Sequence, residues 1–84
     1  MKRIFVTGGT GFLGSYLLRY LLREGNCQVR ALKRANSDMR LVAPVADQIE
    51  WIEGDILDVV LLEEAMQDID QVYHAAAVVS YSPN

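Results

Sequence analysis

The sequence predicts an α/β fold built on a doubly wound parallel sheet, and two observations support this prediction. Short apolar, β-favouring segments alternate with segments of helical periodicity along the 84 residues of the chain. Strands that are separated by helices need crossover connections, and these connections build parallel sheets. In addition, a glycine-rich run at residues 7–14 joins the first strand to the first helix. In a doubly wound sheet such a turn lies at the carboxyl end of its strand, where ligands bind.

About four strands are expected in the sheet order 3-2-1-4, and they are predicted at residues 3–6, 27–32, 49–52 and 71–77. With this order the ligand crevice lies between strands one and four, where the direction of winding reverses. The first helix is predicted at residues 12–23, and its apolar stripe consists of Leu13, Tyr16, Leu17, Tyr20 and Leu21.

Two further helices are predicted from capping residues. Ser37 can cap the amino end of a short helix that runs to Val42, and Pro44 would end that helix. Asp58 can cap a helix over residues 59–66. The inward positions of this last helix are Leu61, Leu62, Ala65 and Met66.

Composition limits the chain to one small domain and argues against several classes of partner. A net charge of −3 argues against nucleic acid and anionic membrane surfaces. No apolar run is long enough to span a membrane, and the apolar segment at residues 4–6 is too short for a signal peptide. The single Cys27 cannot form an internal disulfide or a metal site, and it is expected to be a small buried thiol at a strand start. A cytoplasmic location is expected.

The glycine-rich run has the composition of an anion-binding turn. Unpaired N–H groups and the positive end of the helix dipole meet at the amino terminus of the predicted helix. Gly8 would allow the tight turn off the strand, Gly11 would let a pyrophosphate approach the backbone, and Gly14 would let the helix pack closely on the sheet. The alternative is a glycine-rich turn without a ligand, which leaves the entropic cost of three spaced glycines unexplained.

Two glycine templates fit this run. Gly9, Gly11 and Gly14 satisfy G-x-G-x-x-G, the general dinucleotide fingerprint. Gly8, Gly11 and Gly14 give T-G-x-x-G-x-x-G, which resembles the signature of the short-chain dehydrogenase/reductase superfamily. The full run T-G-G-T-G-F-L-G is similar to its extended branch of epimerases, dehydratases and reductases. The resemblance implies a Rossmann fold that binds NADP, or NAD as the alternative. The cofactor-binding residues that it implies in this loop are Gly8, Thr10, Gly11, Phe12, Leu13 and Gly14.

A basic pair, Lys33 and Arg34, ends the second predicted strand. About twenty residues after the glycine loop, an acid would hold the ribose hydroxyls of NAD, whereas a cation suits the 2′-phosphate of NADP. Arg34 is the stronger candidate because a planar guanidinium can grip a phosphate and stack on adenine. The resemblance implies the same role for Arg34. The alternative is a solvated basic strand end. Asp38 is assigned to the next helix and is not taken as a ribose ligand.

The segment after the third strand, Gly54-Asp55-Ile56-Leu57-Asp58, resembles the G-D-[IL]-x-D of the same branch. In that branch the acid and the next residue hold the adenine ring. The resemblance therefore implies that Asp55 accepts a hydrogen bond from the exocyclic amine and that Ile56 packs against the ring. The alternative is a turn followed by a helix cap, and this simpler role is expected of Asp58.

The segment His74-Ala75-Ala76-Ala77 resembles the H-x-A-A that ends the fourth strand in this branch. Small side chains at Ala75, Ala76 and Ala77 would let the backbone pass beneath the ribose and nicotinamide of a cofactor. His74 is expected to be structural. Residues 79–81 are expected beyond the strand, near the nicotinamide end of the cofactor.

The catalytic residues that the resemblance implies are missing from the chain. These enzymes use a Tyr-x-x-x-Lys pair on a later helix, where the Lys lowers the pKa of the Tyr. No tyrosine in the chain has a lysine four residues further on. We therefore expect residues 1–84 to be the N-terminal dinucleotide-binding segment of a larger domain, inactive on its own. The parent enzyme is expected to be a nucleotide-sugar epimerase or dehydratase, or a carbonyl reductase, acting on a small-molecule substrate.

Two other functional classes remain open from the sequence. One is a regulator that binds a dinucleotide without catalysing a reaction. The other is an interaction fragment, because the fourth strand is expected to have an unpaired outer edge that favours self-association.

Overall fold

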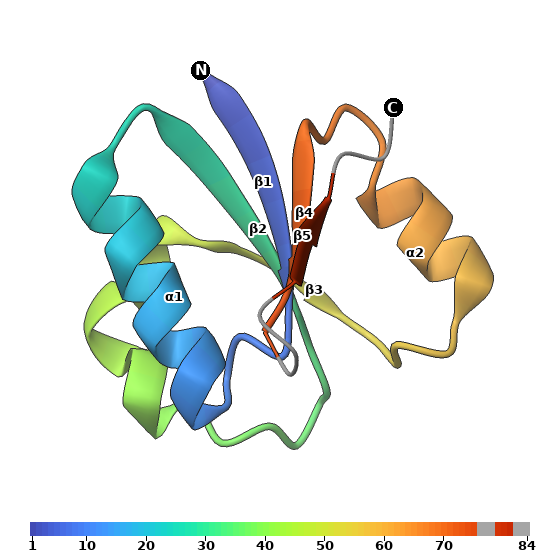
Figure 1. Ribbon diagram of the computed structural model, residues 1–84. Helices are drawn as coiled ribbons and strands as arrows, with labels where there is room; N and C mark the ends of the chain where they lie inside the picture. Colours follow the sequence, from blue (N-terminus) through green and yellow to red (C-terminus); the bar gives the residue numbers. More distant parts are fainter. Residues whose placement is uncertain (76–78, 82–84) are drawn as a thin grey trace.

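The computed structural model describes residues 1–75 and 79–81 (Figure 1). The strands are β1 (Lys2–Thr7), β2 (Cys27–Lys33), β3 (Glu50–Glu53), β4 (Gln71–His74) and β5 (Val79–Tyr81). The helices are α1 (Phe12–Glu24), the 3-10 helix η1 (Arg40–Gln48) and α2 (Val59–Ala65). The predicted alternation of strands and helices is confirmed. None of the helices in the described residues has both the length and the apolar character needed to cross a bilayer.

All strands belong to one sheet in the order β3-β2-β1-β4-β5. β1 pairs in parallel with β2 and with β4, and Ile4 lies opposite Val29 on one side and Gln71 on the other. β2 pairs in parallel with β3. The predicted order 3-2-1-4 of a Rossmann-like sheet is therefore confirmed.

The fourth strand differs from the prediction at its end and at its outer edge. β4 ends at His74, and Ala75 begins a turn. β5 then pairs antiparallel with β4, which brings Val72 opposite Tyr81. The prediction of an unpaired fourth-strand edge is wrong, because the backbone groups along that edge bond to β5 within the same chain. The predicted cause of self-association is removed as well. Residues 79–81, expected beyond the fourth strand, form the strand β5 beside it.

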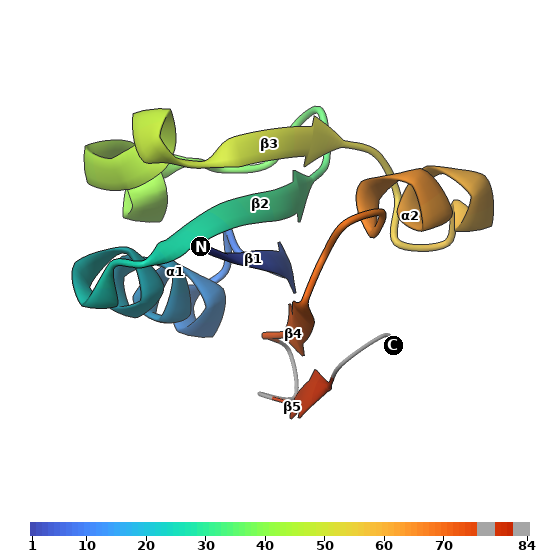
Figure 2. The same ribbon diagram turned by 90° about the horizontal axis from the view of Figure 1, so that it is seen from above.

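Helices cover both faces of the sheet, with α1 and η1 on one face and α2 on the other (Figure 2). Successive side chains of β1 point to opposite faces. Ile4 and Val6 join the buried cluster beneath α1 and η1, whereas Phe5 joins the cluster beneath α2. The first cluster is completed by Leu18, Leu21, Val29, Ala31, Val42, Ile49 and Ala75, and the second by Leu32, Ala65, Ile69 and Val72.

The face that helix α1 presents to the sheet overlaps the predicted one at Leu17 and Leu21 but is rotated from it. Its buried residues are Gly14, Ser15, Leu18 and Leu21, while Leu13, Tyr16 and Tyr20 are exposed. Gly14 explains the difference, because a Cβ there would collide with the Gly8 carbonyl. The helix packs most closely on the loop at this glycine, and the positions four and seven residues later therefore face the sheet.

The segment after β2 also departs from the prediction. Ser37 does not begin a helix, since its backbone and hydroxyl close a turn with Arg34. The helix is the 3-10 helix η1, which starts three residues later at Arg40 and contains Pro44. Pro44 is tolerated there because its fixed φ suits a helical turn, and the i→i+3 ladder of η1 omits one N–H donor at this position.

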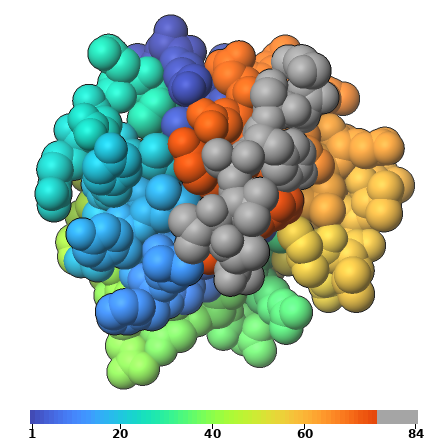
Figure 3. Space-filling model, in the orientation of Figure 1, coloured from blue at the N-terminus to red at the C-terminus, as the bar shows by residue number. Residues whose placement is uncertain are grey.

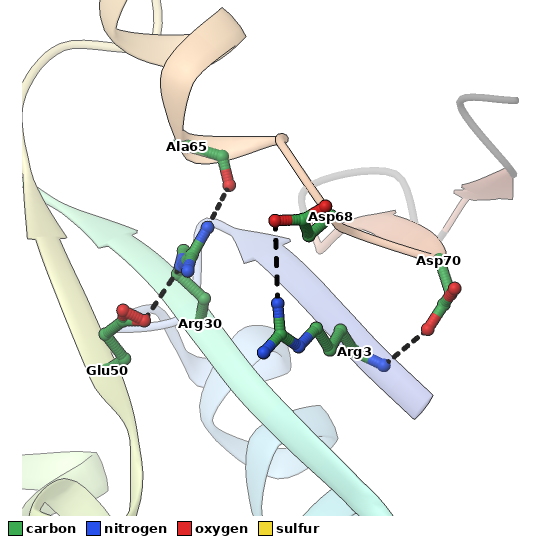
Figure 4. A network of polar contacts seen from close by, with 6 residues as sticks. All are labelled: Arg3, Arg30, Glu50, Ala65, Asp68 and Asp70. Carbon is green, nitrogen blue, oxygen red and sulfur yellow. Dashed lines mark hydrogen bonds and ion pairs between the residues drawn. The ribbon is translucent and has the colours of Figure 1, made fainter. Parts of the chain in front are cut away.

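Side chains cap both ends of α2. The carboxylate of Asp58 accepts from the Leu61 N–H at 3.1 Å, which confirms its predicted capping role. At the other end, Arg30 Nη1 donates to the Ala65 carbonyl at 2.7 Å (Figure 4). Ala65 is buried and Leu61, Leu62 and Met66 pack against the same cluster, as predicted.

Arg30 belongs to a polar network at the end of the sheet opposite the glycine loop (Figure 4). Its Nε also pairs with Glu50 Oε1 at 2.9 Å, which joins β2 to β3. Arg3 fixes the residue that precedes β4, because the Arg3 backbone N–H donates to Asp70 Oδ2 at 2.8 Å.

Cys27 lies at the start of β2, as predicted, but it is only half-buried, whereas a buried thiol was predicted. Its thiol lies 3.3 Å from the Leu21 carbonyl oxygen.

Candidate functional site

A cavity of about 300 Å³ lies at the carboxyl ends of β1, β2 and β3, the edge where doubly wound sheets bind ligands. The β1–α1 turn, the segment after β2 and the β3–α2 connection line it. Figure 3 shows the latter two, in green and yellow, along the lower part of the molecule. The lining residues are Thr7, Gly8, Thr10, Leu32, Lys33, Arg34, Ser37, Gly54 and Ile56.

Some of the predicted site residues line this cavity, and others do not. The predicted residues that line it are Gly8, Thr10, Lys33, Arg34 and Ile56. Those that continue the glycine turn into α1, outside the lining, are Gly11, Phe12, Leu13 and Gly14. Asp55 and Ala75 are also outside the lining. Ala76 and Ala77 lie outside the described residues.

The backbone of the glycine turn has the tight geometry that was predicted from Gly8. Gly8 has a φ of 73°, in the left-handed region that favours glycine, and its carbonyl accepts from the Gly11 N–H at 3.2 Å. Gly14 needs to lack a side chain because α1 touches the Gly8 backbone there. Gly9 has a role that the templates did not show. A Cβ at Gly9 would lie 2.8 Å from Leu18 Cδ1, so this glycine also lets α1 approach the sheet.

The amino end of α1 is open for an anion. Gly11 is its N-cap residue, and no side chain caps the first turn. Phe12 is 81% exposed, and a Cβ at Gly11 would meet no described atom closer than the Gly8 oxygen at 3.6 Å. Among the described residues, no acceptor is bonded to the N–H groups of Phe12 and Leu13. Unpaired N–H groups beside the positive end of a helix dipole are the arrangement that binds phosphates.

The two cations after β2 have different surroundings. Lys33 Nζ lies 3.5 Å from Glu53 Oε2 on the neighbouring strand β3. Arg34 is exposed, and its backbone N–H donates to Ser37 Oγ at 2.9 Å. Within the described residues, its guanidinium forms no hydrogen bond or ion pair. Arg34 is therefore the cation at this cavity that is available to a ligand.

The nearby Asp38 is occupied by another arginine. Arg40 Nη2 lies 2.7 Å from Asp38 Oδ2, and the Arg40 Nε also contacts this carboxylate. Hydrogen bonds from the Arg40 side chain and backbone lower the pKa of Asp38. Its carboxylate is thus held by its own segment, in agreement with leaving Asp38 out of the predicted ribose ligands.

In the β3–α2 connection, Ile56 lines the cavity, whereas Asp55 does not. Asp55 Oδ1 accepts from the Leu57 N–H at 2.9 Å, which is the local turn considered as the alternative to ligand binding. Ile56 lines the cavity and is 40% exposed. The connection thus offers the cavity an apolar side chain, while the Asp55 carboxylate supports the turn beside it.

The ends of β1 and β4 are tied together below the glycine turn. Thr7 Oγ1 and His74 Nδ1 lie 2.7 Å apart, and the Ala75 N–H donates to the Thr7 carbonyl at 3.0 Å. This arrangement supports the structural role expected of His74. Ala75 is buried at 2% exposure, so a small residue is needed there for packing.

The sequence reasoning missed four residues that line the cavity, namely Thr7, Leu32, Ser37 and Gly54. Three of them end or follow a predicted strand, and their position at the carboxyl edge of the sheet was the signal that could have found them. Ser37 carried no such signal, because its capping preference pointed to a helix.

A larger hollow of about 500 Å³ lies at the opposite end of the sheet, beside Arg3, Arg30 and Glu50. Its arginines are already paired within the chain, Arg30 with Glu50 and Arg3 with Asp68 at 3.8 Å. Across the part of the chain that the structure describes, no three His, Cys, Asp or Glu side chains gather as metal ligands. The carboxyl edge is therefore the better candidate site.

A Rossmann-like sheet with a glycine turn at a helix amino terminus defines a nucleotide-binding class of protein. The chain matches the NAD-dependent epimerase/dehydratase family over residues 4–84, and it belongs to this family. The resemblance to the extended short-chain dehydrogenase/reductases is thereby confirmed.

Relatives of known identity are several times longer. The chain is 39% identical over 79 residues to a 3 beta-hydroxysteroid dehydrogenase/Delta 5-->4-isomerase of Mycobacterium tuberculosis, covering 94% of this chain and 20% of that protein. It is 40% identical over 79 residues to a dTDP-glucose 4,6-dehydratase of Mycolicibacterium smegmatis, covering 89% and 24% respectively. The structure of the Bordetella bronchiseptica enzyme WbmH in complex with NAD⁺ superposes with a TM-score of 0.74 at 28% identity, covering 88% of this chain and 25% of that one. The chain thus spans about a fifth to a quarter of these proteins.

Proposed function

We propose that residues 1–84 are the N-terminal dinucleotide-binding segment of an extended short-chain dehydrogenase/reductase and that this segment prefers NADP to NAD. The observation that carries the proposal is Arg34. It lines the cavity after β2, and its guanidinium has no partner among the described residues. Among the described residues, none that lines the cavity has a carboxylate to accept bonds from the ribose hydroxyls of NAD. A guanidinium at this position favours a 2′-phosphate.

The residues of the site fit the parts of a dinucleotide in order. The amino end of α1 suits the pyrophosphate, and Gly11 leaves room for it. Leu32 and Ile56 offer apolar surface to the adenine, and the Arg34 side chain lies beside them at the same cavity. Ala75, Ala76 and Ala77 remain our proposed neighbours of the nicotinamide ribose. When bound, the cofactor supplies hydride transfer, and the protein supplies position and charge.

The activity of the whole protein is also a proposal. Relatives named as a dehydratase and as a steroid dehydrogenase support the two classes predicted from the sequence, a nucleotide-sugar enzyme and a carbonyl reductase. WbmH was solved with NAD⁺, so NAD is the competing ligand for this chain. The cytoplasmic location stays a prediction from the sequence.

Charge reversal at Arg34 tests the cofactor preference. Arg34→Glu should weaken NADP binding by about 1.5–3 kcal/mol, the scale of a lost charged hydrogen bond, and leave NAD binding nearly unchanged. Titration calorimetry with both dinucleotides on the purified chain measures this. Arg23→Glu is the matched control, because Arg23 is an exposed arginine in the last turn of α1, outside the cavity lining.

Two outcomes would contradict the proposal in different ways. Equal losses for NADP and NAD in Arg34→Glu would make Arg34 a structural residue. No binding of either dinucleotide by the unaltered chain would remove the proposed function itself.

A further inference from the structure

Ser37 and Arg34 are joined by two reciprocal hydrogen bonds. The Arg34 N–H donates to Ser37 Oγ at 2.9 Å, and the Ser37 N–H donates to the Arg34 carbonyl at 3.1 Å. Together they close a four-residue turn directly after β2. Ser37 is half-buried and lines the same cavity as Arg34. The hydroxyl thus fixes the backbone of the residue whose side chain carries the proposed specificity.

We propose that Ser37 is a positioning residue that sets the preference of this site for dinucleotides with a 2′-phosphate. The inference rests on the proposed function. An exposed arginine has many conformations, and the ordering of its side chain on a phosphate costs affinity. A backbone that is already fixed at Arg34 lowers this cost, since it restricts where the guanidinium can lie.

The other charged groups nearby do not position Arg34. Lys33 is paired with Glu53, and Asp38 is paired with Arg40. Among the described residues, the Arg34 guanidinium has no carboxylate partner to hold it. The turn closed by Ser37 is therefore the element that determines where Arg34 stands beside the cavity.

The test compares Ser37→Ala with Ser37→Thr, which keeps the hydroxyl, by measuring the Kd values of NADP and NAD for the full chain. Ser37→Ala should raise the Kd of NADP about 3- to 10-fold, the effect of one hydrogen bond, while the Kd of NAD stays unchanged. Ser37→Thr should restore the preference. A purely structural role for Ser37 would raise both Kd values together.

A double-variant cycle with Arg34→Gln separates action through Arg34 from any other route. If Ser37 acts through Arg34, Ser37→Ala should have no further effect on NADP binding in the Arg34→Gln background. An undiminished effect in that background would overturn the inference. So would an unchanged ratio of the two Kd values in Ser37→Ala.

Folding and the underlying function are controlled separately. Ser37→Val and Ser37→Thr have similar shapes and differ in the hydroxyl, so this pair gives the same comparison if Ser37→Ala unfolds. The valine variant should have a Kd for NADP about 3- to 10-fold above that of the threonine variant, with equal Kd values for NAD, and equal NADP values in the two variants would overturn the inference. If the unaltered chain binds no NADP, or if Arg34→Gln keeps the preference, the proposed function fails and this inference fails with it. Failure confined to the Ser37 variants leaves the proposed function standing.

Discussion

At the residue scale, the glycines of the β1–α1 turn divide into two kinds. Gly8 and Gly14 are required by the chain itself, Gly8 for its positive φ and Gly14 because a Cβ would meet backbone atoms, while a Cβ at Gly9 would displace the end of the Leu18 side chain. Gly11 is not required by the chain, because its φ is −76° and a Cβ there would meet only open space and the Gly8 oxygen at 3.6 Å. A glycine that the fold does not need is the one that a ligand is expected to require.

Substitution at the two kinds of glycine should therefore separate folding from binding. Gly14→Ala should destabilise the chain by about 1–3 kcal/mol or more, because its Cβ meets backbone atoms that cannot move aside cheaply. Gly11→Val should cost only about 1 kcal/mol, the loss of a favourable N-cap residue, and should abolish dinucleotide binding. Urea unfolding and dinucleotide titration measure the two effects. Retained affinity in Gly11→Val would contradict the pyrophosphate site.

At the element scale, the short helix α2 depends on side chains at its ends. It has seven residues, and isolated helices of this length are not stable in water. Its N-cap Asp58 and the Arg30 guanidinium at its last carbonyl satisfy backbone groups that would otherwise be unpaired. α2 follows the β3–α2 connection that lines the cavity, so its stability also bears on the site.

Removal of the N-cap should be measurable. Asp58→Ala is expected to lower the free energy of unfolding by about 1 kcal/mol, since the Leu61 N–H loses its acceptor. Asp47→Ala removes an exposed carboxylate of η1 that forms no hydrogen bond or ion pair with the described residues, and it is the charge-matched control. Chemical denaturation of both variants gives the comparison. Equal stabilities of Asp58→Ala and Asp47→Ala would show that the cap does not support α2.

At the scale of the whole molecule, the site joins segments that are distant in sequence. The cavity is lined from the ends of β1, β2 and β3, and the ends of β1 and β4 are tied by Thr7 and His74. A chain of 84 residues buries only about 60–65% of its unfolded surface on folding, less than a larger domain does, and is therefore of marginal stability. A ligand that contacts several strand ends at once should stabilise the native state as a whole.

Saturation with NADP should therefore raise the urea midpoint of the entire unfolding transition. At a concentration 100 times its Kd the expected gain is about 2.7 kcal/mol, because the ligand binds the folded state alone. Arg34→Glu should gain less at the same concentration, and Gly11→Val should gain nothing. An identical midpoint with and without NADP in the unaltered chain would contradict this coupling.

The amino-acid sequence by itself determined the features that depend on neighbouring residues. The glycine spacing predicted the turn, the alternation of strands and helices predicted the parallel order 3-2-1-4, and Asp58 predicted its own cap. The turn and the cap succeed because backbone sterics and capping act over a few residues. The strand order succeeds because a crossover connection between neighbouring strands follows the right-handed rule.

Only the tertiary structure decided which atoms meet across the sheet. The close contact at Gly14 sets the rotation of α1 about its axis, so that Leu18 faces the core. The outer edge of β4 pairs with β5. The tertiary structure also set Lys33 against Glu53, twenty residues apart in sequence, and so left Arg34 as the available cation. Helix phase and strand register follow from close packing between distant segments, and local periodicity does not contain that information.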